Sequence, residues 1–169
     1  MNEQLTSYIR SLQADSRIAT LDSASLKHVV VLKVLSILSW DVFNLDEFSP
    51  IDVICGRAEY TLMVKGVAQI NIGFMRKHDD VIARLKSLNF SVERREQLAV
   101  MTNGITWWFF RPFTLCGSRP DPDYFCIVDI LNQEPEHVSE VFLLFLSKAA
   151  VEAEEREADH AETGQSMAD

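Results

Sequence analysis

Carboxylates and cations that suit chemistry on a phosphate gather in one stretch of this chain, between residues 50 and 85. Glu59 has the clearest position among them, because it stands at the start of a segment of alternating apolar residues. Metal-dependent phosphodiester hydrolysis needs at least two carboxylates to hold Mg²⁺ against a phosphate oxygen, and it gains from a nearby cation. The other groups of these types are the carboxylates Asp52, Asp79 and Asp80 and the cations Arg76, Lys77 and Arg84.

The segment that must position Glu59 reads as two strands, over residues 59–75, joined by a tight turn at Lys65-Gly66. Apolar side chains alternate with other residues along both strands. Because side chains alternate between the two faces of a strand, the pattern places Gly73 and Met75 on one common face. The apolar positions are Tyr60, Leu62 and Val64 in the first strand, and Ala68, Ile70, Ile72 and Phe74 in the second.

This hairpin resembles the core of the PD-(D/E)XK nucleases, in the form found at the N-terminus of type I restriction enzyme R subunits. That family has Asp-Tyr at the start of one strand and Glu-x-Lys on the next. Here Glu59-Tyr60 stands at the Asp-Tyr position, Gly73 at the Glu and Met75 at the catalytic Lys. The resemblance therefore implies a degenerate active site in which Glu59 is a relic of the catalytic and metal-binding residues. It implies Mg²⁺ as cofactor only if activity survives.

The flanks extend the resemblance over residues 20–131. Residues 38–50, which begin Leu-Ser-Trp-Asp, are similar to the family's Leu-Gly-Trp-Asp segment, although Ile51 replaces an acidic residue. Residues 100–110 are similar to its Leu-Thr-Asn-Gly-x-x-Trp strand and turn. The supporting Gln of the following helix is missing, since no Gln occurs between Gln69 and Gln97. The cations Arg76, Lys77 and Arg84 are then candidate binding residues.

Composition predicts one globular domain over residues 1–151 and an acidic, disordered tail over residues 152–169. The chain has 169 residues and a net charge of −9, of which the tail carries −6. Phosphate neutralisation is the main source of nucleic-acid affinity, so any nucleic-acid binding is expected to be weak. We expect no membrane span, no secretory signal and a cytoplasmic location. The three cysteines, which lack metal-ligand spacing, are expected to be free thiols: Cys55, Cys116 and Cys126.

Periodicity predicts an α/β domain with a central mixed sheet flanked by helices, and the resemblance implies that this domain is of the restriction-endonuclease-like kind. Glycine at position 104 suits a turn with positive φ, and Trp40 and Trp107 are expected in the core. The predicted helices are residues 2–14, 24–38, 78–89 and 135–150, and the apolar stripe predicted for the second helix includes Val29 and Val30. The predicted strands, besides the hairpin, are residues 40–43, 51–55, 98–101, 107–110 and 125–131, the last at an edge, and residues 116–123 are predicted as a loop.

Several alternatives remain open at this level. Asp22 either caps the second helix or, as the resemblance suggests for this neighbourhood, faces the metal site. The aromatic cluster of residues 107–113 either packs in the core or stacks on bases. The favoured function is a catalytically inactive module that binds a protein partner or a second copy, in a restriction or DNA-processing context. The others are a divergent Mg²⁺-dependent DNA endonuclease with a carboxylate relocated to Asp52, Asp79 or Asp80, and an acidic regulator that competes for a basic partner.

Overall fold

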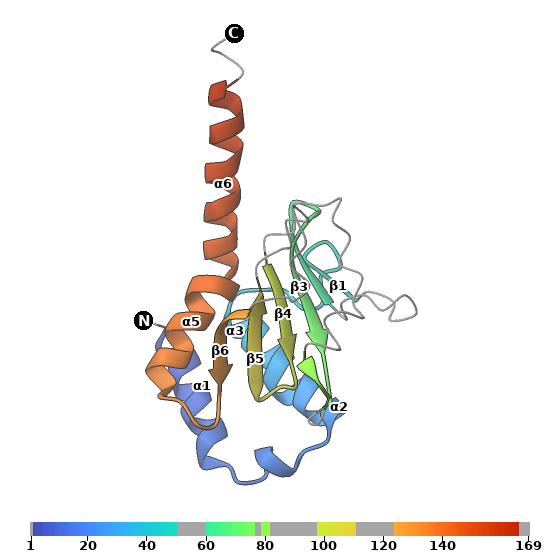
Figure 1. The fold of residues 1–169 in the computed structure, drawn as a ribbon, viewed down its shortest axis with the longest axis vertical. Coiled ribbons are helices and arrows are strands. Elements are labelled where there is room, and N and C mark those ends of the chain that lie inside the picture. The colour runs from blue at the N-terminus through green and yellow to red at the C-terminus, as the bar shows by residue number, and fades with distance from the viewer. Residues whose placement is uncertain (1, 51–59, 77–78, 82–97, 111–123, 166–169) are drawn as a thin grey trace.

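A six-stranded mixed sheet forms the centre of the molecule in the computed structural model (Figure 1). The structure describes residues 2–50, 60–76, 79–81, 98–110 and 124–165. The strands lie in the order β1-β2-β3-β4-β5-β6; β3 and β4 are parallel and every other neighbouring pair is antiparallel. The strands are β1 (Phe48–Pro50), β2 (Tyr60–Val64), β3 (Val67–Phe74), β4 (Leu98–Thr102), β5 (Thr106–Phe110) and β6 (Tyr124–Asp129).

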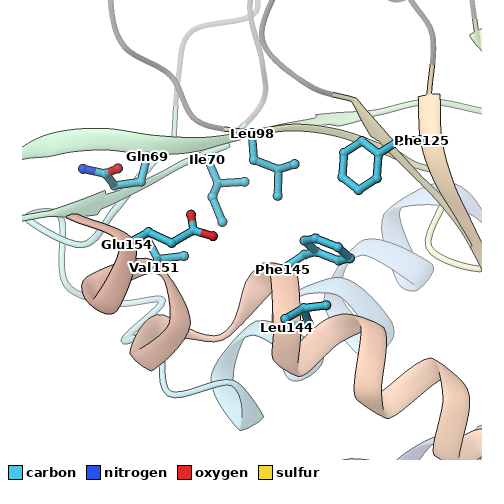
Figure 2. A pocket seen from close by; sticks show the side chains of 8 residues that line it. All are labelled: Gln69, Ile70, Leu98, Phe125, Leu144, Phe145, Val151 and Glu154. Carbon is cyan, nitrogen blue, oxygen red and sulfur yellow. The ribbon is translucent and has the colours of Figure 1, made fainter. Parts of the chain in front are cut away.

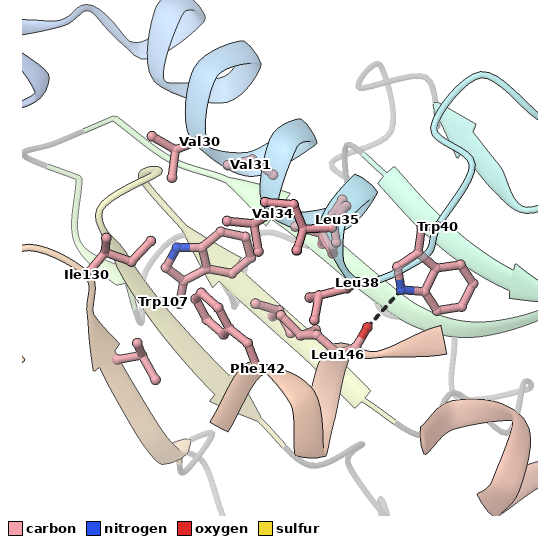
Figure 3. Close-up of a cluster of buried hydrophobic side chains, with 14 of the residues drawn as sticks. Val30, Val31, Val34, Leu35, Leu38, Trp40, Trp107, Ile130, Phe142 and Leu146 are labelled. Carbon is pink, nitrogen blue, oxygen red and sulfur yellow. Dashed lines mark hydrogen bonds between the residues drawn. The ribbon is translucent and has the colours of Figure 1, made fainter. Parts of the chain in front are cut away.

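Helices pack on one face of this sheet and share its main hydrophobic core, so the predicted central mixed sheet with flanking helices is confirmed (Figure 3). Trp40 and Trp107 are both buried there, as predicted, at 2% and 0% exposure. In the described part of the chain, no helix is both long and apolar enough to cross a membrane. The helical segments are α1 (Glu3–Ala14), η1 (Ile18–Thr20), α2 (Ser23–Leu26), η2 (Lys27–Leu32), α3 (Lys33–Ile37), α5 (Pro135–Leu146) and α6 (Lys148–Gln165).

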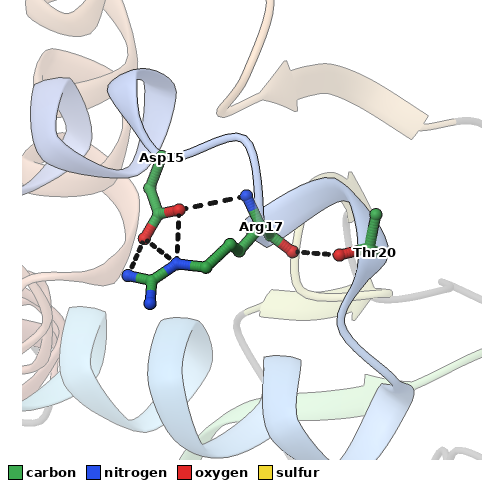
Figure 4. A network of polar contacts seen from close by, with 3 residues as sticks. All are labelled: Asp15, Arg17 and Thr20. Atoms are coloured by element: carbon green, nitrogen blue, oxygen red, sulfur yellow. Dashed lines mark hydrogen bonds and ion pairs between the residues drawn. The ribbon is translucent and has the colours of Figure 1, made fainter.

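The N-terminal helix α1 confirms the helix predicted over residues 2–14, and hydrogen bonds fix it at both ends. Asn2 caps its start, and Gln13 Nε2 donates to the carbonyls of Ile130 and Gln133 at 2.8 and 2.7 Å. Beyond its end, Asp15 accepts hydrogen bonds from the backbone and the guanidinium of Arg17 (Figure 4). These bonds lower the pKa of the Asp15 carboxyl to about 2.

The second helical stretch runs through α2, η2 and α3 without a break, but its middle part has π-helical hydrogen bonding. A π segment places more residues in each turn than an α-helix, so the side-chain phase shifts along the helix. Consequently Val31 and Leu35 are fully buried, while Val29, which the α-helical period placed in the apolar stripe, is 43% exposed. Sequence periodicity was therefore right about the helix and wrong about Val29.

The predicted strand at residues 40–43 is wrong, because this region forms consecutive turns that end at β1. Asp41 Oδ1 accepts the backbone N–H of Phe43 at 3.1 Å, and Asn44 Oδ1 accepts that of Asp46 at 3.0 Å. Such local bonds give the backbone partners that compete with a strand ladder. The strand predicted at residues 51–55, the helix at 78–89 and the loop at 116–123 lie wholly or largely outside the described residues.

The hairpin of β2 and β3 confirms the prediction, including its turn, where Lys65 and Gly66 both have positive φ (50° and 77°). One irregularity breaks its register: Leu62 pairs with Ile70, but Met63 pairs with Ala68. Gln69 is therefore the extra residue of a β-bulge, a feature that redirects side chains locally.

Strands β4, β5 and β6 also confirm their predictions, with β6 at the edge of the sheet. The turn between β4 and β5 has Gly104 at φ +93°, as predicted. A Cβ at this position would lie 2.8 Å from Leu26 Cβ, so glycine also permits the close approach of the helix.

The predicted helix at residues 135–150 is two helices, α5 and α6, separated at Ser147 (φ −70°, ψ 140°). Ser147 Oγ accepts the backbone N–H of Ala150 at 3.2 Å and so caps α6. Tertiary bonds fix the break, because Trp40 Nε1 donates to the Leu146 carbonyl at 2.7 Å and the Lys148 N–H donates to the Leu38 carbonyl at 3.1 Å.

Residues 152–169 were predicted as a disordered tail, but helix α6 continues to Gln165, so the described part of this segment, residues 152–165, is helical (Figure 1). The high helix propensity of its many Ala and Glu residues favours this conformation. Its first turns also contact the domain: Val151 is buried, Lys148 Nζ lies 2.9 Å from Glu47 Oε2, and Lys65 Nζ lies 3.9 Å from Glu155 Oε2. The hydrogen bond from Lys148 lowers the pKa of Glu47.

Candidate functional site

Gly73 and Met75, two of the positions that the resemblance assigns to catalysis, lie on the second face of the sheet, opposite the main core. Gly73 pairs with Met101 across the parallel β3–β4 ladder, and the Met75 N–H extends this ladder by donating to the Thr102 carbonyl at 2.9 Å. The Met75 side chain is 3% exposed and belongs to an apolar cluster with Ala99, Met101 and Phe110. At this position the chain thus has a packed thioether, which is neither a Mg²⁺ ligand nor a proton donor.

Polar groups on the same face bind each other. Thr61 and Asn71 face each other across β2 and β3, and the Thr61 hydroxyl donates to Asn71 Oδ1 at 2.7 Å. Both residues are only 4% exposed. Because a buried polar group is costly unless it is hydrogen-bonded, this pair serves the stability of the hairpin.

A cleft of about 450 Å³ opens beside Met75, where β3 ends next to the start of α2. Two cations reach it, Lys27 from η2 and Arg76 from the end of β3. The Lys27 ammonium lies 5.2 Å from the ring centroid of Tyr60 and 5.5 Å from that of Phe74, which are cation–π distances. The described residues that line it are Ser23, Ala24, Lys27, Phe74, Met75, Arg76 and Asp79.

The carboxylate of this cleft belongs to Asp79, one of the three positions considered for a relocated ligand. Its Oδ2 accepts the backbone N–H of Arg76 at 2.9 Å, which holds the turn after β3. Among the residues that the structure describes, Asp79 is the one carboxylate in the lining. The described lining, with two cations and one carboxylate, attracts an anionic group, whereas a Mg²⁺ site for hydrolysis requires a second carboxylate.

Asp22 is a helix cap, the first of its two sequence alternatives. Its Oδ1 accepts the Ser25 N–H at 2.7 Å, and this bond lowers the pKa of the carboxyl. For the aromatic cluster of residues 107–113, the alternative of packing in the core is confirmed at the positions that are buried. Trp107 and Phe109 are in the main core and Phe110 is in the cluster around Met75, with Trp108 packed against it.

Several predicted site residues lie outside the described part of the chain: Glu59, Lys77, Arg84 and Asp52. Within the described ranges, no group of three or more His, Cys, Asp or Glu side chains is arranged to hold a metal ion. Cys126 is a free thiol whose pKa is raised by burial, as expected of a reduced cysteine; Cys55 and Cys116 are not described.

Sequence reasoning missed Lys27 and Gln69. Lys27 reaches the cleft from the residues where the helix becomes π-helical, and no local sequence pattern predicted this change from α-helical to π-helical hydrogen bonding. Gln69 was placed by simple alternation, which a bulge interrupts. Comparison with models of known protein families, with curated proteins and with solved structures found no match. The restriction-endonuclease-like identity therefore stays a prediction.

Proposed function

We propose that this chain is a catalytically inactive, restriction-endonuclease-like domain that acts in the cytoplasm as a binding module for another protein. The observation that supports this proposal is the burial of Met75 in the cluster with Ala99, Met101 and Phe110. A lysine that orients an attacking water must reach the solvent of an active site, whereas this side chain is only 3% exposed and packs in an apolar cluster. The position has become part of the packing of the sheet.

The edge strand β6 is the surface that best fits a protein partner. Tyr124 and Ile127 on this strand are 48% and 36% exposed, and Leu144 of the neighbouring helix α5 is 62% exposed. Exposed apolar groups at a sheet edge favour pairing with another chain. The net charge of −9 opposes strong binding to the phosphates of nucleic acid.

The cleft beside Met75 favours a second candidate, a divergent Mg²⁺-dependent DNA endonuclease with a relocated site. Asp79 and Arg76 both line this cleft, so a carboxylate and a cation lie next to the degenerate position. In this candidate Glu59 would supply the second carboxylate.

Cleavage of supercoiled plasmid separates the two candidates. We expect the purified chain to leave plasmid intact in the presence of Mg²⁺ or Mn²⁺. Cleavage by the parent that is lost in both Glu59→Ala and Asp79→Asn would overturn the proposal and support the endonuclease. Cleavage that survives both substitutions identifies a contaminating nuclease, and the assay is then repeated on repurified protein.

Affinity capture from cells that express the chain tests the binding surface. We expect a protein that binds the parent and Leu45→Lys, and that is lost with Ile127→Lys. Leu45 is a matched control because it is 69% exposed and far from β6 in the sequence. The same difference must then appear in the Kd between purified proteins. Equal binding by both variants would show that the β6 edge is not the interface.

A further inference from the structure

A small pocket lies between the sheet and the place where α5 meets α6, away from the candidate site (Figure 2). The break at Ser147 redirects the chain between the two helices and leaves a space of about 210 Å³. For comparison, an apolar cavity of about 150 Å³ accepts benzene in another protein. The lining residues are Gln69, Ile70, Leu98, Phe125, Leu144, Phe145, Val151 and Glu154.

The β-bulge brings an amide into this pocket. Simple alternation would point Gln69 and Ile70 to opposite faces of β3, but both line the pocket. The Gln69 side chain is 3% exposed, and its Oε1 is buried with no hydrogen-bond partner in the described part of the molecule. An unpaired buried acceptor is costly, so a group that donates a hydrogen bond here would gain more than it does in water.

The two ends of the pocket differ in chemistry (Figure 2). Gln69 and the carboxylate of Glu154 lie at one end. Phe125 and Phe145 lie at the other, with ring centroids 5.2 Å apart in an edge-to-face arrangement. The polar end thus presents oxygen acceptors and one negative charge, while the other end presents aromatic surface.

We propose that this pocket binds a small arylalkyl amine. The ammonium group donates a hydrogen bond to Gln69 Oε1 and forms an ion pair with Glu154, while the aromatic ring packs against Phe125 and Phe145. The volume suits one ring with a short chain. This assignment does not depend on the proposed protein partner of the β6 edge, although Leu144 and Phe125 are exposed near both the pocket and that edge.

Titration calorimetry of the full chain with 2-phenylethylamine tests the assignment. We expect saturable one-to-one binding with a Kd of about 1 mM or tighter. Phenylacetate has the same ring and chain but a negative end, so it should show no binding. 2-Phenylethanol keeps a donor without charge, and it should bind about tenfold more weakly than the amine.

Three variants locate the site. Glu154→Gln should weaken amine binding about tenfold, because the ammonium group loses its ion pair. Glu154 is an exposed residue, so this substitution leaves the fold intact. Glu152→Gln removes the same charge from the same helix outside this pocket, and it should leave the Kd unchanged. Gln69→Leu should abolish binding while the free variant melts at or above the parent temperature, because an unpaired acceptor is removed.

Absence of binding up to 10 mM amine, on the order of tenfold above the expected Kd, would overturn the proposal. So would equal binding of phenylacetate, or equal weakening by Glu152→Gln and Glu154→Gln, since the amine would then respond only to net charge. If Gln69→Leu fails to fold, the comparison of Glu154→Gln with Glu152→Gln decides alone.

Discussion

Replacing Met75 with lysine, the residue that an active nuclease of the resembled family has there, should destabilise this protein strongly. The side chain is 3% exposed among apolar neighbours, so the new ammonium group would lose most of its hydration. A buried lysine becomes neutral instead of remaining charged, through a lowered pKa. Lowering it from about 10.4 to 7 or below costs roughly 4–5 kcal/mol at pH 7, at about 1.4 kcal/mol per unit.

The pH dependence distinguishes this cost from a packing defect. The folded-state pKa of the new lysine lies below its unfolded value, so the destabilisation is full below the folded pKa. It fades as pH rises toward about 10.4, where the unfolded chain also becomes neutral. Urea denaturation at pH 7 and pH 10 should therefore show a large loss at the lower pH and a smaller one at the higher.

Two controls complete the series. Met75→Leu conserves volume and should cost less than about 1.5 kcal/mol. Met63→Lys places the same group at a half-buried position of the same hairpin, and its effect should be small. A Met75→Lys variant that unfolds at the parent's urea midpoint would refute the reasoning, because position 75 would then be open to solvent as an active-site lysine is.

Three further outcomes follow from the described contacts. Trp40→Phe should cost about 1–2 kcal/mol more than Trp107→Phe in urea denaturation, because the first indole donates to a backbone carbonyl and the second has no acceptor among the described residues; equal costs would contradict this. Gly104→Ala should lower Tm more than Gly66→Ala, since both have positive φ but only the first Cβ would meet a neighbour, at 2.8 Å; the reverse order would contradict it. In an NMR titration the Asp15 carboxyl should titrate near pH 2, so its contribution to stability is present above its ordinary pKa of 3.8 and is lost as pH falls from 3.8 toward 2; a midpoint near 3.8 would show that its hydrogen bonds do not persist in solution.

Much of the sheet could be predicted from local signals. Alternation over residues 60–74 identified the hairpin, and the Lys65-Gly66 pair matched a turn that requires positive φ. Gly104 was predictable for the same reason. The burial of Trp40 and Trp107 was expected from the resemblance, which places an aromatic residue between sheet and helix in both segments.

The errors arose where tertiary contacts override local pattern. The break at Ser147 depends on bonds that Leu146 and Lys148 make to residues about a hundred positions away. The bulge at Gln69 is a property of the β2–β3 register, which one strand's sequence does not encode. The π-helical turn that exposes Val29 likewise has the apolar composition of an ordinary helix. It changes only the direction in which each side chain faces.

The candidate site was predictable only in part. The resemblance assigned Gly73 and Met75 to positions that hold catalytic groups in the resembled family, and the structure places Met75 in an apolar cluster. It gave no sign that Lys27, from a distant helix, would reach the cleft beside Met75 and Arg76. Convergence of residues far apart in sequence depends on the packing of helix on sheet.

Mn²⁺ titration followed by NMR of the methionine methyl groups tests the central claim, that position 75 is a packing position and not part of a metal site. Mn²⁺ is paramagnetic and replaces Mg²⁺ at oxygen ligands, so a bound ion broadens nearby signals. We predict that the Met75 and Met101 methyl signals keep their line widths at millimolar Mn²⁺. Selective broadening of Met75 at low Mn²⁺ concentration, abolished by Glu59→Ala, would show a metal site beside this residue and contradict the account.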